Sequence, residues 1–422
     1  MNIEMETSKL DKVSTRDLEL GMYVDRLDRP WTETRFMFQG FFIRSQEEIE
    51  ELRRYCEFVY IDRFHKRDAT APSARAPLTT GTPVPAHGSS IARSPGYPPP
   101  VYPTTVAVEK EIVLAKPLYT EALSATKNII SGMLQSGRLD MDLARSTVTP
   151  MMESMLRNPD ALIWLSRMRQ QDSYMFNHAL NCSIWGIAFA RHMGVDKQVI
   201  FEIGLGCMLF DAGKTQLPLT LLLKPGPLDT AEMELAQSHV AHGCAIIKGM
   251  DGVTPRIMDL VRAHHERFDG SGYPAGLKGD DIPPAARLAG IVDCYDALIS
   301  FRPYAVPQAP DEALKLMYSW RDKLFHGDMI EQFMQVVGVF PTGSLVELNT
   351  GAVGVIIAQN ENNRRLRPRL ALVLDNDKRR MPYTQVVDLL YDQPYADSAQ
   401  FWIDRCLQPG AYGVSPESLE LN

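Results

Sequence analysis

Histidines and aspartates gather in one region of this sequence, and these residue types can bind transition metals. Five of the nine histidines, with His192 near a helix end left aside, lie between Asn177 and Glu266, and the dipeptides Phe210-Asp211 and Val292-Asp293 lie in the same helical region. Imidazole nitrogens mixed with carboxylate oxygens suit iron, manganese or zinc and leave positions open for water. The pattern therefore indicates a hydrolytic metal site. The five histidines are His178, His239, His242, His264 and His265.

The segment from His264 to Pro274 is more specific than any single histidine. It reads HHERFDGSGYP and so matches the pattern HHExxDGxGYP. The residues from Gly270 to Pro274 alone would indicate only a tight loop after a helix. Together with the preceding histidines and Asp269, they give this region a resemblance to the HD-GYP domain family, the metal-dependent phosphodiesterases that hydrolyse cyclic di-GMP.

Other motifs occur in the order that this resemblance requires, across roughly residues 170–310. His178 in FNHALN resembles the first histidine ligand of the family, and residues 12–62 resemble the short N-terminal domain of unknown function that often precedes HD-GYP domains. The remaining matches are Asp211-Ala212-Gly213-Lys214 with the end of HDxGK, Leu223 to Leu228 with NKPGKL, His239 and Gly243 with HPxxG, and Asp293, Asp296 and Arg302-Pro303-Tyr304 with xADxxDALxSxRPY.

Two of the histidines could also have ordinary structural roles. His178 shares an apolar helical face with Cys182 and Trp185, where a histidine bonded to a carbonyl would be ordinary, but its register with the other motifs favours a ligand. His242 follows His239 by three residues on the same expected helix. It could face the same cavity and add a ligand, or it could be an ordinary exposed histidine.

The resemblance implies a two-metal mechanism, in which a metal-bound water attacks the phosphodiester and the cations stabilise the charge that develops. Asp211 would bridge the two ions and, with Lys214, would be catalytic. The implied metal is iron or manganese. One ion would be held by His178, Asp211 and Asp293, and the other by Asp211, His239 and the pair His264 and His265.

The resemblance also implies substrate contacts. Lys214 and Arg302 would meet phosphate oxygens as fixed cations, the lysine as a point charge and the arginine as a fork. The other residues implied in the substrate site are Asp296 and the loop residues Gly272, Tyr273 and Pro274.

Three positions depart from the family pattern. The HD dipeptide is Phe210-Asp211, so a benzyl group stands where the family has an imidazole ligand. Tyr174 replaces the glutamate of trinuclear members, and Ala305 replaces a basic residue that often follows RPY. A binuclear or mononuclear site is therefore expected. Because losing a residue that only supports a ligand costs about 10–100-fold, Phe210 is expected to reduce activity.

The elements that must position these residues are mainly helices. Apolar residues recur at helical spacing after Thr105, and the period falls to two beyond Pro341. The expected fold is mainly α: a small N-terminal α/β domain at 9–65, a disordered Pro-rich linker at 66–104, an all-α HD-superfamily domain at 105–340 and a β-rich appendage at 341–422. The expected helices are 106–135, 142–157, 161–170, 173–193, 197–210, 230–249, 254–265, 284–299 and 311–338.

Composition limits the remaining classes of function. The chain has 422 residues, and its 52 acidic side chains outnumber 44 basic ones to give a net charge of −8, so no chain-wide basic field could hold DNA. Six cysteines lack CxxC spacing, which favours reduced thiols. No apolar run approaches the length needed to span a bilayer. A cytoplasmic protein is expected.

Two classes of function follow. The first is a phosphodiesterase that hydrolyses cyclic di-GMP to pGpG, with further hydrolysis to GMP left open and with activity reduced by Phe210. The alternative is a weak or inactive module that binds cyclic di-GMP or docks diguanylate cyclase (GGDEF) domains. A homodimer is also left open. An HD hydrolase of another nucleotide is a weaker third hypothesis, because the GYP loop separates this family from the broader HD superfamily.

Overall fold

A computed structural model gives the structure of this chain. Its contacts divide the chain into two compact units, Met1–His87 and Gly88–Asn422, which are described separately. The expected linker at 66–104 falls almost entirely outside the described residues, as do Arg302 and its RPY motif. The described residues are 10–28, 41–43, 46–62, 102–168, 174–300, 307–338, 340–359, 367–389, 401–408 and 410–414.

The N-terminal unit has the α/β character that its sequence predicts. Its antiparallel strands follow the order β1-β4-β2-β3. Ile49 and Leu52 of the helix pack in one buried cluster with Val24, Val59 and Ile61 of the sheet. The elements are β1 (Leu10–Ser14), the 3₁₀ turn η1 (Thr15–Asp17), β2 (Tyr23–Leu27), β3 (Phe41–Phe42), α1 (Gln46–Tyr55) and β4 (Phe58–Asp62).

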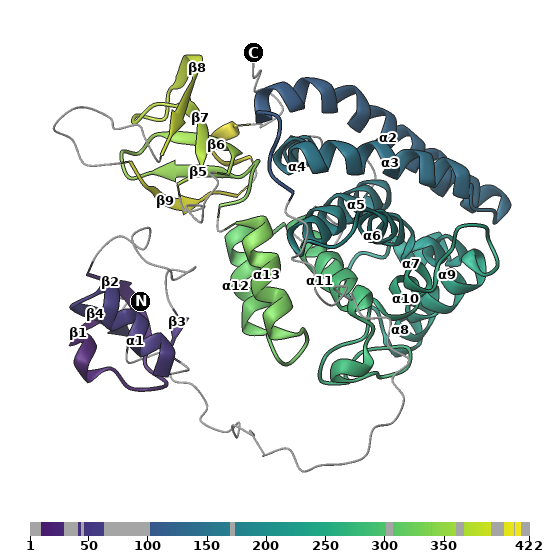
Figure 1. The fold of residues 1–422 in the computed structure, drawn as a ribbon, viewed down its shortest axis with the longest axis horizontal. Coiled ribbons are helices and arrows are strands. Elements are labelled where there is room, and N and C mark those ends of the chain that lie inside the picture. Colours follow the sequence, from purple (N-terminus) through teal and green to yellow (C-terminus); the bar gives the residue numbers. More distant parts are fainter. Residues whose placement is uncertain are drawn as a thin grey trace, which may run out of the picture. The chain divides into compact units, whose positions relative to one another are not determined.

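The second unit is mainly helical, as predicted, and Figure 1 shows its helices gathered around α5 and α6. Among the described residues, no helix is both long enough and apolar enough to cross a membrane. The helices are α2 (Val108–Ser136), α3 (Met141–Arg157), α4 (Pro159–Met168), α5 (Tyr174–His192), α6 (Lys197–Leu209), α7 (Leu219–Leu222), α8 (Thr230–Gln237), α9 (His239–Ile247), α10 (Pro255–Ala263), α11 (Pro284–Ile299), α12 (Pro310–Ser319) and α13 (Gly327–Val337), with 3₁₀ turns η3 (Ala212–Gln216) and η4 (Gly279–Asp281).

Helix α5 forms the centre of this unit. Every residue from His178 to Ala190 is buried, and the helix contacts α2, α6, α11 and α13. A helix that is apolar on all sides belongs inside a protein. Trp185 meets Tyr295 of α11 edge to face at 5.2 Å between ring centroids, and Phe189 meets Phe333 of α13 at 5.2 Å. The helix that carries His178 is therefore held on several sides.

Two expected helices are each broken in the structure. The segment 230–249 divides at Ser238, which lies between α8 and α9 and whose hydroxyl donates to the carbonyl of Leu235 at 2.6 Å. The segment 311–338 divides after α12, where Asp322 has a φ of 58° and its carboxylate accepts from the amide of Gly327 at 3.2 Å. That bond caps α13. Apolar spacing continues across both breaks, so spacing alone predicts single helices.

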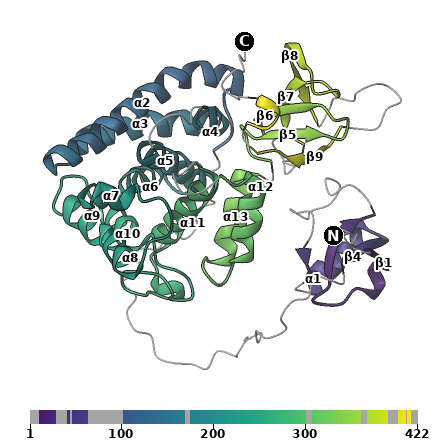
Figure 2. The ribbon, with the colours of Figure 1, turned by 180° about the vertical axis from the view of Figure 1, so that it is seen from behind.

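Helices α2 and α3 lie side by side in both views (Figures 1 and 2). A fully buried carboxylate, Glu111, joins them. It accepts from the hydroxyl of Ser154 at 2.7 Å and from Nε and a terminal nitrogen of Arg157 at 2.9 and 2.7 Å. A buried charge needs such a set of partners because desolvation is costly.

The C-terminal part of the second unit is an antiparallel sheet with strand order β8-β7-β6-β5-β9. The first two strands lie beyond Pro341, where the apolar period of the sequence falls to two, and Gly351, with a φ of 87°, lies in the turn between them. Asp160 of α4 accepts from the hydroxyl of Thr342 at 3.0 Å and from the amide of Gln359 at 3.2 Å, which ties the sheet to the helices. The strands are β5 (Leu345–Leu348), β6 (Val353–Ala358), β7 (Arg369–Leu374), β8 (Arg380–Asp388) and β9 (Ile403–Cys406), followed by the 3₁₀ turn η5 (Ala411–Gly413).

Candidate metal centre

Helices distant in the sequence bring the six predicted ligands together. His178 lies in the second turn of α5, His239 begins α9, and Asp293 lies on α11. Asp211 lies where α6 passes into η3, and His264 and His265 follow α10. They form two groups that share Asp211, and the ligand atoms in each group lie within 4.8 Å of one another.

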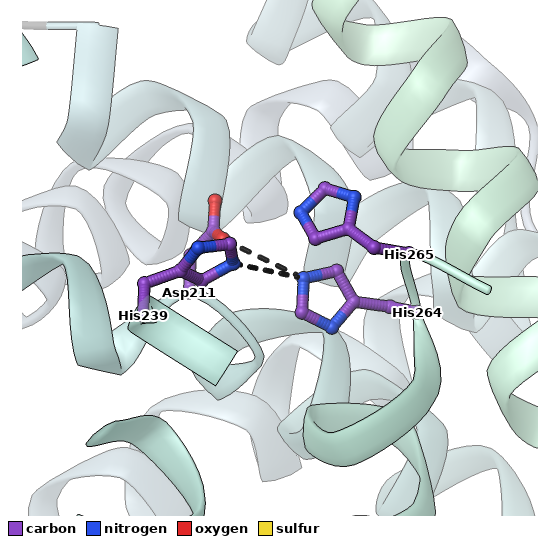
Figure 3. A group of neighbouring side chains, drawn as sticks. All are labelled: Asp211, His239, His264 and His265. Atoms are coloured by element: carbon purple, nitrogen blue, oxygen red, sulfur yellow. Dashed lines mark hydrogen bonds and ion pairs between the residues drawn. The ribbon is translucent and has the colours of Figure 1, made fainter. Parts of the chain in front are cut away.

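The first group contains four residues, which Figure 3 shows turned toward one another: Asp211, His239, His264 and His265. The Nε2 atoms of His239 and His264 lie 3.5 Å apart. Asp211 Oδ1 lies 3.4 Å from His239 Nε2 and 3.7 Å from His264 Nε2. We call these residues the four-residue group.

The second group contains His178, Asp211 and Asp293, and we call it the three-residue group. His178 Nε2 lies 3.5 Å from Asp211 Oδ2 and 3.2 Å from Asp293 Oδ1. The other oxygen of Asp293 lies 3.8 Å from His265 Nδ1. Both carboxylates therefore face the two groups at once.

The four-residue group has the spacing and the chemistry of a metal site. Nitrogen ligands about 2.1 Å from a tetrahedral ion lie about 3.4 Å apart, close to the separations of His239, His264 and Asp211. Asp211 Oδ1 is buried and accepts no hydrogen bond from the described residues. An acceptor that is buried without a donor is costly unless a cation supplies the missing contact. The residues present therefore fit a transition-metal ion.

Small residues allow these elements to approach closely. A Cβ on Gly213 would lie 1.9 Å from the carbonyl oxygen of His239, so the turn after Asp211 could not otherwise reach α9. A Cβ on Gly290 would lie 2.7 Å from the carbonyl oxygen of His264, where α11 crosses the end of α10. Glycine at both positions lets the ligands carried by four elements, η3, α9, α10 and α11, meet in one site.

Contacts on the far side of each ring orient the histidines. His239 Nδ1 lies 2.6 Å from the carbonyl oxygen of Ala236, and His264 Nδ1 lies 3.1 Å from that of Val261. His178 Nδ1 lies 2.7 Å from a carboxylate oxygen of Asp296. Such bonds fix the tautomer and leave Nε2 available as a ligand.

Burial and charge shift the pKa values of these groups. Burial lowers the pKa of His239 to about 4 and that of His265 well below its usual range, so both imidazoles are neutral near pH 7. Burial alone would raise the pKa of Asp211, but the Lys214 ammonium and the surrounding histidines hold it well below its usual range. Neutral imidazole and ionised carboxylate are the forms that bind metals.

Phe210 lies within the site rather than away from it. Its side chain is fully buried. Its ring stacks on His264, with 4.6 Å between centroids and 19° between planes, and meets His178 edge to face at 6.0 Å. In the described part of the chain, no group able to hold a metal includes His242, whose Nδ1 is buried and accepts no hydrogen bond. The structure therefore gives no support to compensation by His242.

Two residues predicted to contact substrate have partners inside the protein. Lys214 Nζ lies 2.5 Å from Asp211 Oδ2, with a quarter of its side chain exposed. Asp296 is 1% exposed, and its oxygens are bonded to His178 Nδ1 and, at 3.0 Å, to the amide nitrogen of Asn181. Asp296 therefore supports His178 and has little surface to offer a ligand. Arg302 lies outside the described residues.

The GYP loop closes over one side of the site. Glu266 accepts from the backbone amides of Ala275 and Leu277 at 2.8 and 2.9 Å, which draws residues 266–277 into a closed loop. Tyr273 stacks on His265 with 4.6 Å between ring centroids. Gly272 and Pro274 flank this tyrosine in the sequence, and the Tyr273-Pro274 peptide bond is cis.

Sequence reasoning missed the supporting roles of Asn181 and Glu266, and it placed Cys182 beside His178 without giving it a role in the site. Asn181 and Cys182 follow His178 by three and four residues, so helical spacing places all three on one face. Cys182 Sγ lies 3.6 Å from His178 Nδ1, and Asn181 supports Asp296. Helical spacing was therefore a signal that could have found them. Glu266 belongs to the HHE motif, but its role in closing the loop depends on backbone geometry that the sequence does not reveal.

Comparisons with known proteins show the family of this chain. The family described as "HD domain" matches residues 160–328, and "Domain of unknown function (DUF3391)" matches residues 10–144. The cyclic di-GMP phosphodiesterase PA4108 of Pseudomonas aeruginosa is 32% identical over 385 residues, which cover 90% of this chain and 89% of that protein. This chain belongs to the HD-GYP-type cyclic di-GMP phosphodiesterase family.

Other proteins match this chain with different coverage. The cyclic di-GMP phosphodiesterase response regulator RpfG of Xanthomonas campestris is 36% identical over 37% of this chain and 43% of its own length. A 3′3′-cGAMP-specific phosphodiesterase of Vibrio cholerae is 30% identical over 40% of this chain and 32% of its own length. The solved structure of Bd1817, an HD-GYP-like protein of Bdellovibrio bacteriovorus, covers 78% of this chain and 99% of that one, at 14% identity and a TM-score of 0.45.

Proposed function

We propose that this chain is a metal-dependent phosphodiesterase that opens cyclic di-GMP to linear pGpG, and that Phe210 lowers its activity. The observation that carries the proposal is the four-residue group, three histidines and one aspartate with metal-ligand spacing around a buried carboxylate oxygen that lacks a donor. Family membership supports the reaction class, and similarity to PA4108 along 90% of the chain favours cyclic di-GMP over 3′3′-cGAMP as substrate.

Each residue has a proposed task. Asp211, His239, His264 and His265 hold an iron or manganese ion, which supplies an activated water and a Lewis acid when it is bound. Lys214, partly exposed beside Asp211, offers its ammonium to a phosphate oxygen. Asp296 orients His178. The remaining proposed contacts with the dinucleotide come from Arg302 and from Gly272, Tyr273 and Pro274 of the GYP loop.

Phe210 is expected to lower the rate of hydrolysis because it leaves the three-residue group one ligand short. This group keeps one imidazole, that of His178, and the ring of Phe210 has no atom that can ligate a metal. Removing a residue that only supports a ligand costs about 10–100-fold in affinity or activity, so a missing ligand should cost at least that much.

The test compares the wild type with Phe210→His after both are loaded with Mn²⁺ or, without oxygen, Fe²⁺. Cyclic di-GMP and 3′3′-cGAMP are supplied separately, and chromatography follows pGpG. We expect the wild type to hydrolyse cyclic di-GMP and Phe210→His to do so at least 10-fold faster. Adding Asp211→Asn should abolish hydrolysis of cyclic di-GMP both in the wild type and in Phe210→His. If the wild type leaves cyclic di-GMP intact while Phe210→His hydrolyses it, the wild type is not an efficient phosphodiesterase.

A binding or docking module is the second candidate, and Phe210 is the observation that favours it. A site with a depleted ligand set can retain a nucleotide without cleaving it. Calorimetry with cyclic di-GMP then shows tight binding and no product. If calorimetry shows neither binding nor turnover, only the form that docks a diguanylate cyclase (GGDEF) domain is left, and a pull-down with such a domain tests it.

A further inference from the structure

The two carboxylate oxygens of Asp211 have different surroundings. Oδ2 is bonded to the ammonium of Lys214 at 2.5 Å and faces His178 of the three-residue group at 3.5 Å. Oδ1 faces His239 and His264 of the four-residue group, and no described residue donates a hydrogen bond to it. One oxygen of Asp211 is thus already in contact with a positive charge, and the other still lacks one.

The two groups also differ in ligands. The four-residue group offers three imidazoles and a carboxylate, which is a complete set for a tetrahedral ion or a partial set for a larger coordination number. The three-residue group offers one imidazole and two carboxylates, and both of these carboxylates are oriented toward the other group as well. Phe210 places a buried phenyl ring against both groups, so it fills space next to the ligands without binding.

The charges of the site also favour one divalent cation over two. Asp211, Asp293 and Asp296 bring three carboxylates to the site, and Lys214 brings one ammonium. With the imidazoles neutral, as metal binding requires, a single divalent cation neutralises this set. A second would leave the buried site with a net positive charge and would be repelled by the ammonium that lies on Asp211 Oδ2.

We propose that this centre takes one transition-metal ion, held by the four-residue group, and that the Lys214 ammonium takes the place of a second cation beside Asp211 Oδ2. The proposal deepens the proposed function and rests on its metal site, but not on turnover. It assigns Lys214 a charge-balancing role in the free protein in addition to its contact with phosphate.

The first test measures metal stoichiometry without any nucleotide. The chain is stripped with a chelator, equilibrated with Mn²⁺ and desalted, and manganese per chain is measured by elemental analysis and by electron paramagnetic resonance. We expect one Mn²⁺ per chain with the spectrum of an isolated ion. Two tightly bound ions with an exchange-coupled spectrum would overturn the proposal.

Matched variants locate the ion. His239→Gln lies in the four-residue group and is expected to lose the ion, whereas His178→Gln lies in the three-residue group and is expected to keep it. Circular dichroism checks that both variants fold. If a folded His178→Gln variant loses the ion as completely as His239→Gln does, the ion also depends on the three-residue group. That result would contradict the proposal.

A second pair of variants tests Lys214. Lys214→Met removes the ammonium and is expected to admit a second, weaker Mn²⁺, whereas Lys214→Arg keeps the charge and should not. Phe210→His adds an imidazole and is expected to take two ions. Equal stoichiometry in Lys214→Met and Lys214→Arg would refute the role of the ammonium. A wild type that takes one ion but does not hydrolyse cyclic di-GMP would contradict the proposed function and leave this inference standing.

Discussion

Single side chains give this site its chemistry because each one is fixed by a partner outside the ligand set. His239 and His264 are fixed by backbone carbonyls, and His178 is fixed by Asp296. Burial lowers the pKa of His239 and His265, so these two imidazoles are neutral and can bind metal without first losing a proton. The same burial makes the metal-free protein less stable in acid, because His239 and His265 bind protons more readily in the unfolded chain than in the folded one.

The pKa of His239 predicts how the free energy of unfolding of the metal-free protein changes with pH. Its pKa falls from 6.5 to about 4 on folding, so the unfolded state binds more protons between these values and stability rises with pH across that window. We expect His239→Gln to flatten this rise. Urea unfolding of the chelator-treated protein between pH 4 and 6.5 measures it, with His242→Gln as the control. An unchanged slope in His239→Gln would contradict the assignment.

At the scale of elements, the approach of loops and helices decides whether the ligands meet. The GYP loop depends on Gly272, because a Cβ there would lie 2.3 Å from the amide nitrogen of Arg267 and 2.5 Å from the carbonyl oxygen of His265. Both of these are backbone atoms, so no side-chain movement can relieve the overlap. The loop in turn brings Tyr273 against His265.

Gly272→Ala is therefore expected to open the GYP loop. The amides of Ala275 and Leu277, which donate to Glu266, should exchange hydrogen at least 10-fold faster, since the overlap with backbone breaks the closed form. Ser271→Ala in the same loop is the control, because its exposed hydroxyl bonds to Asp269 at 2.6 Å and not to Glu266. Unchanged exchange in Gly272→Ala, measured by mass spectrometry, would show that the loop tolerates a side chain.

The pairing of α2 with α3 gives a separate prediction about stability. Arg157→Ala leaves Glu111 buried with Ser154 as its remaining side-chain donor. We expect a loss of about 2–4 kcal/mol, less than for a fully buried pair because the arginine side chain is 38% exposed. Urea unfolding measures it. The double variant Glu111→Ala with Arg157→Ala should lose less than the sum of the single variants, and simple additivity would contradict the coupling.

For the whole molecule, the sequence predicts the classes of structure better than the boundaries between elements. Strong apolar periodicity predicts the helical unit and its first two sheet strands, and motif register singles out six candidate ligands, which the fold brings close together. Apolar spacing continues through Ser238, so it does not reveal the break there. Helical spacing places Asn181 beside His178, but it does not reveal that both bond to Asp296 of another helix. The position of Phe210 against His264 likewise required the fold.

The central claim is that a metal ion held by the four-residue group hydrolyses cyclic di-GMP, and one titration tests it. Chelator-treated protein receives Mn²⁺ in steps, and bound metal and pGpG formation are measured on the same samples. The account predicts that turnover rises in proportion to the ion bound, reaches its plateau at one Mn²⁺ per chain, and is absent in His239→Gln. Full metal occupancy with cyclic di-GMP left unhydrolysed would contradict it.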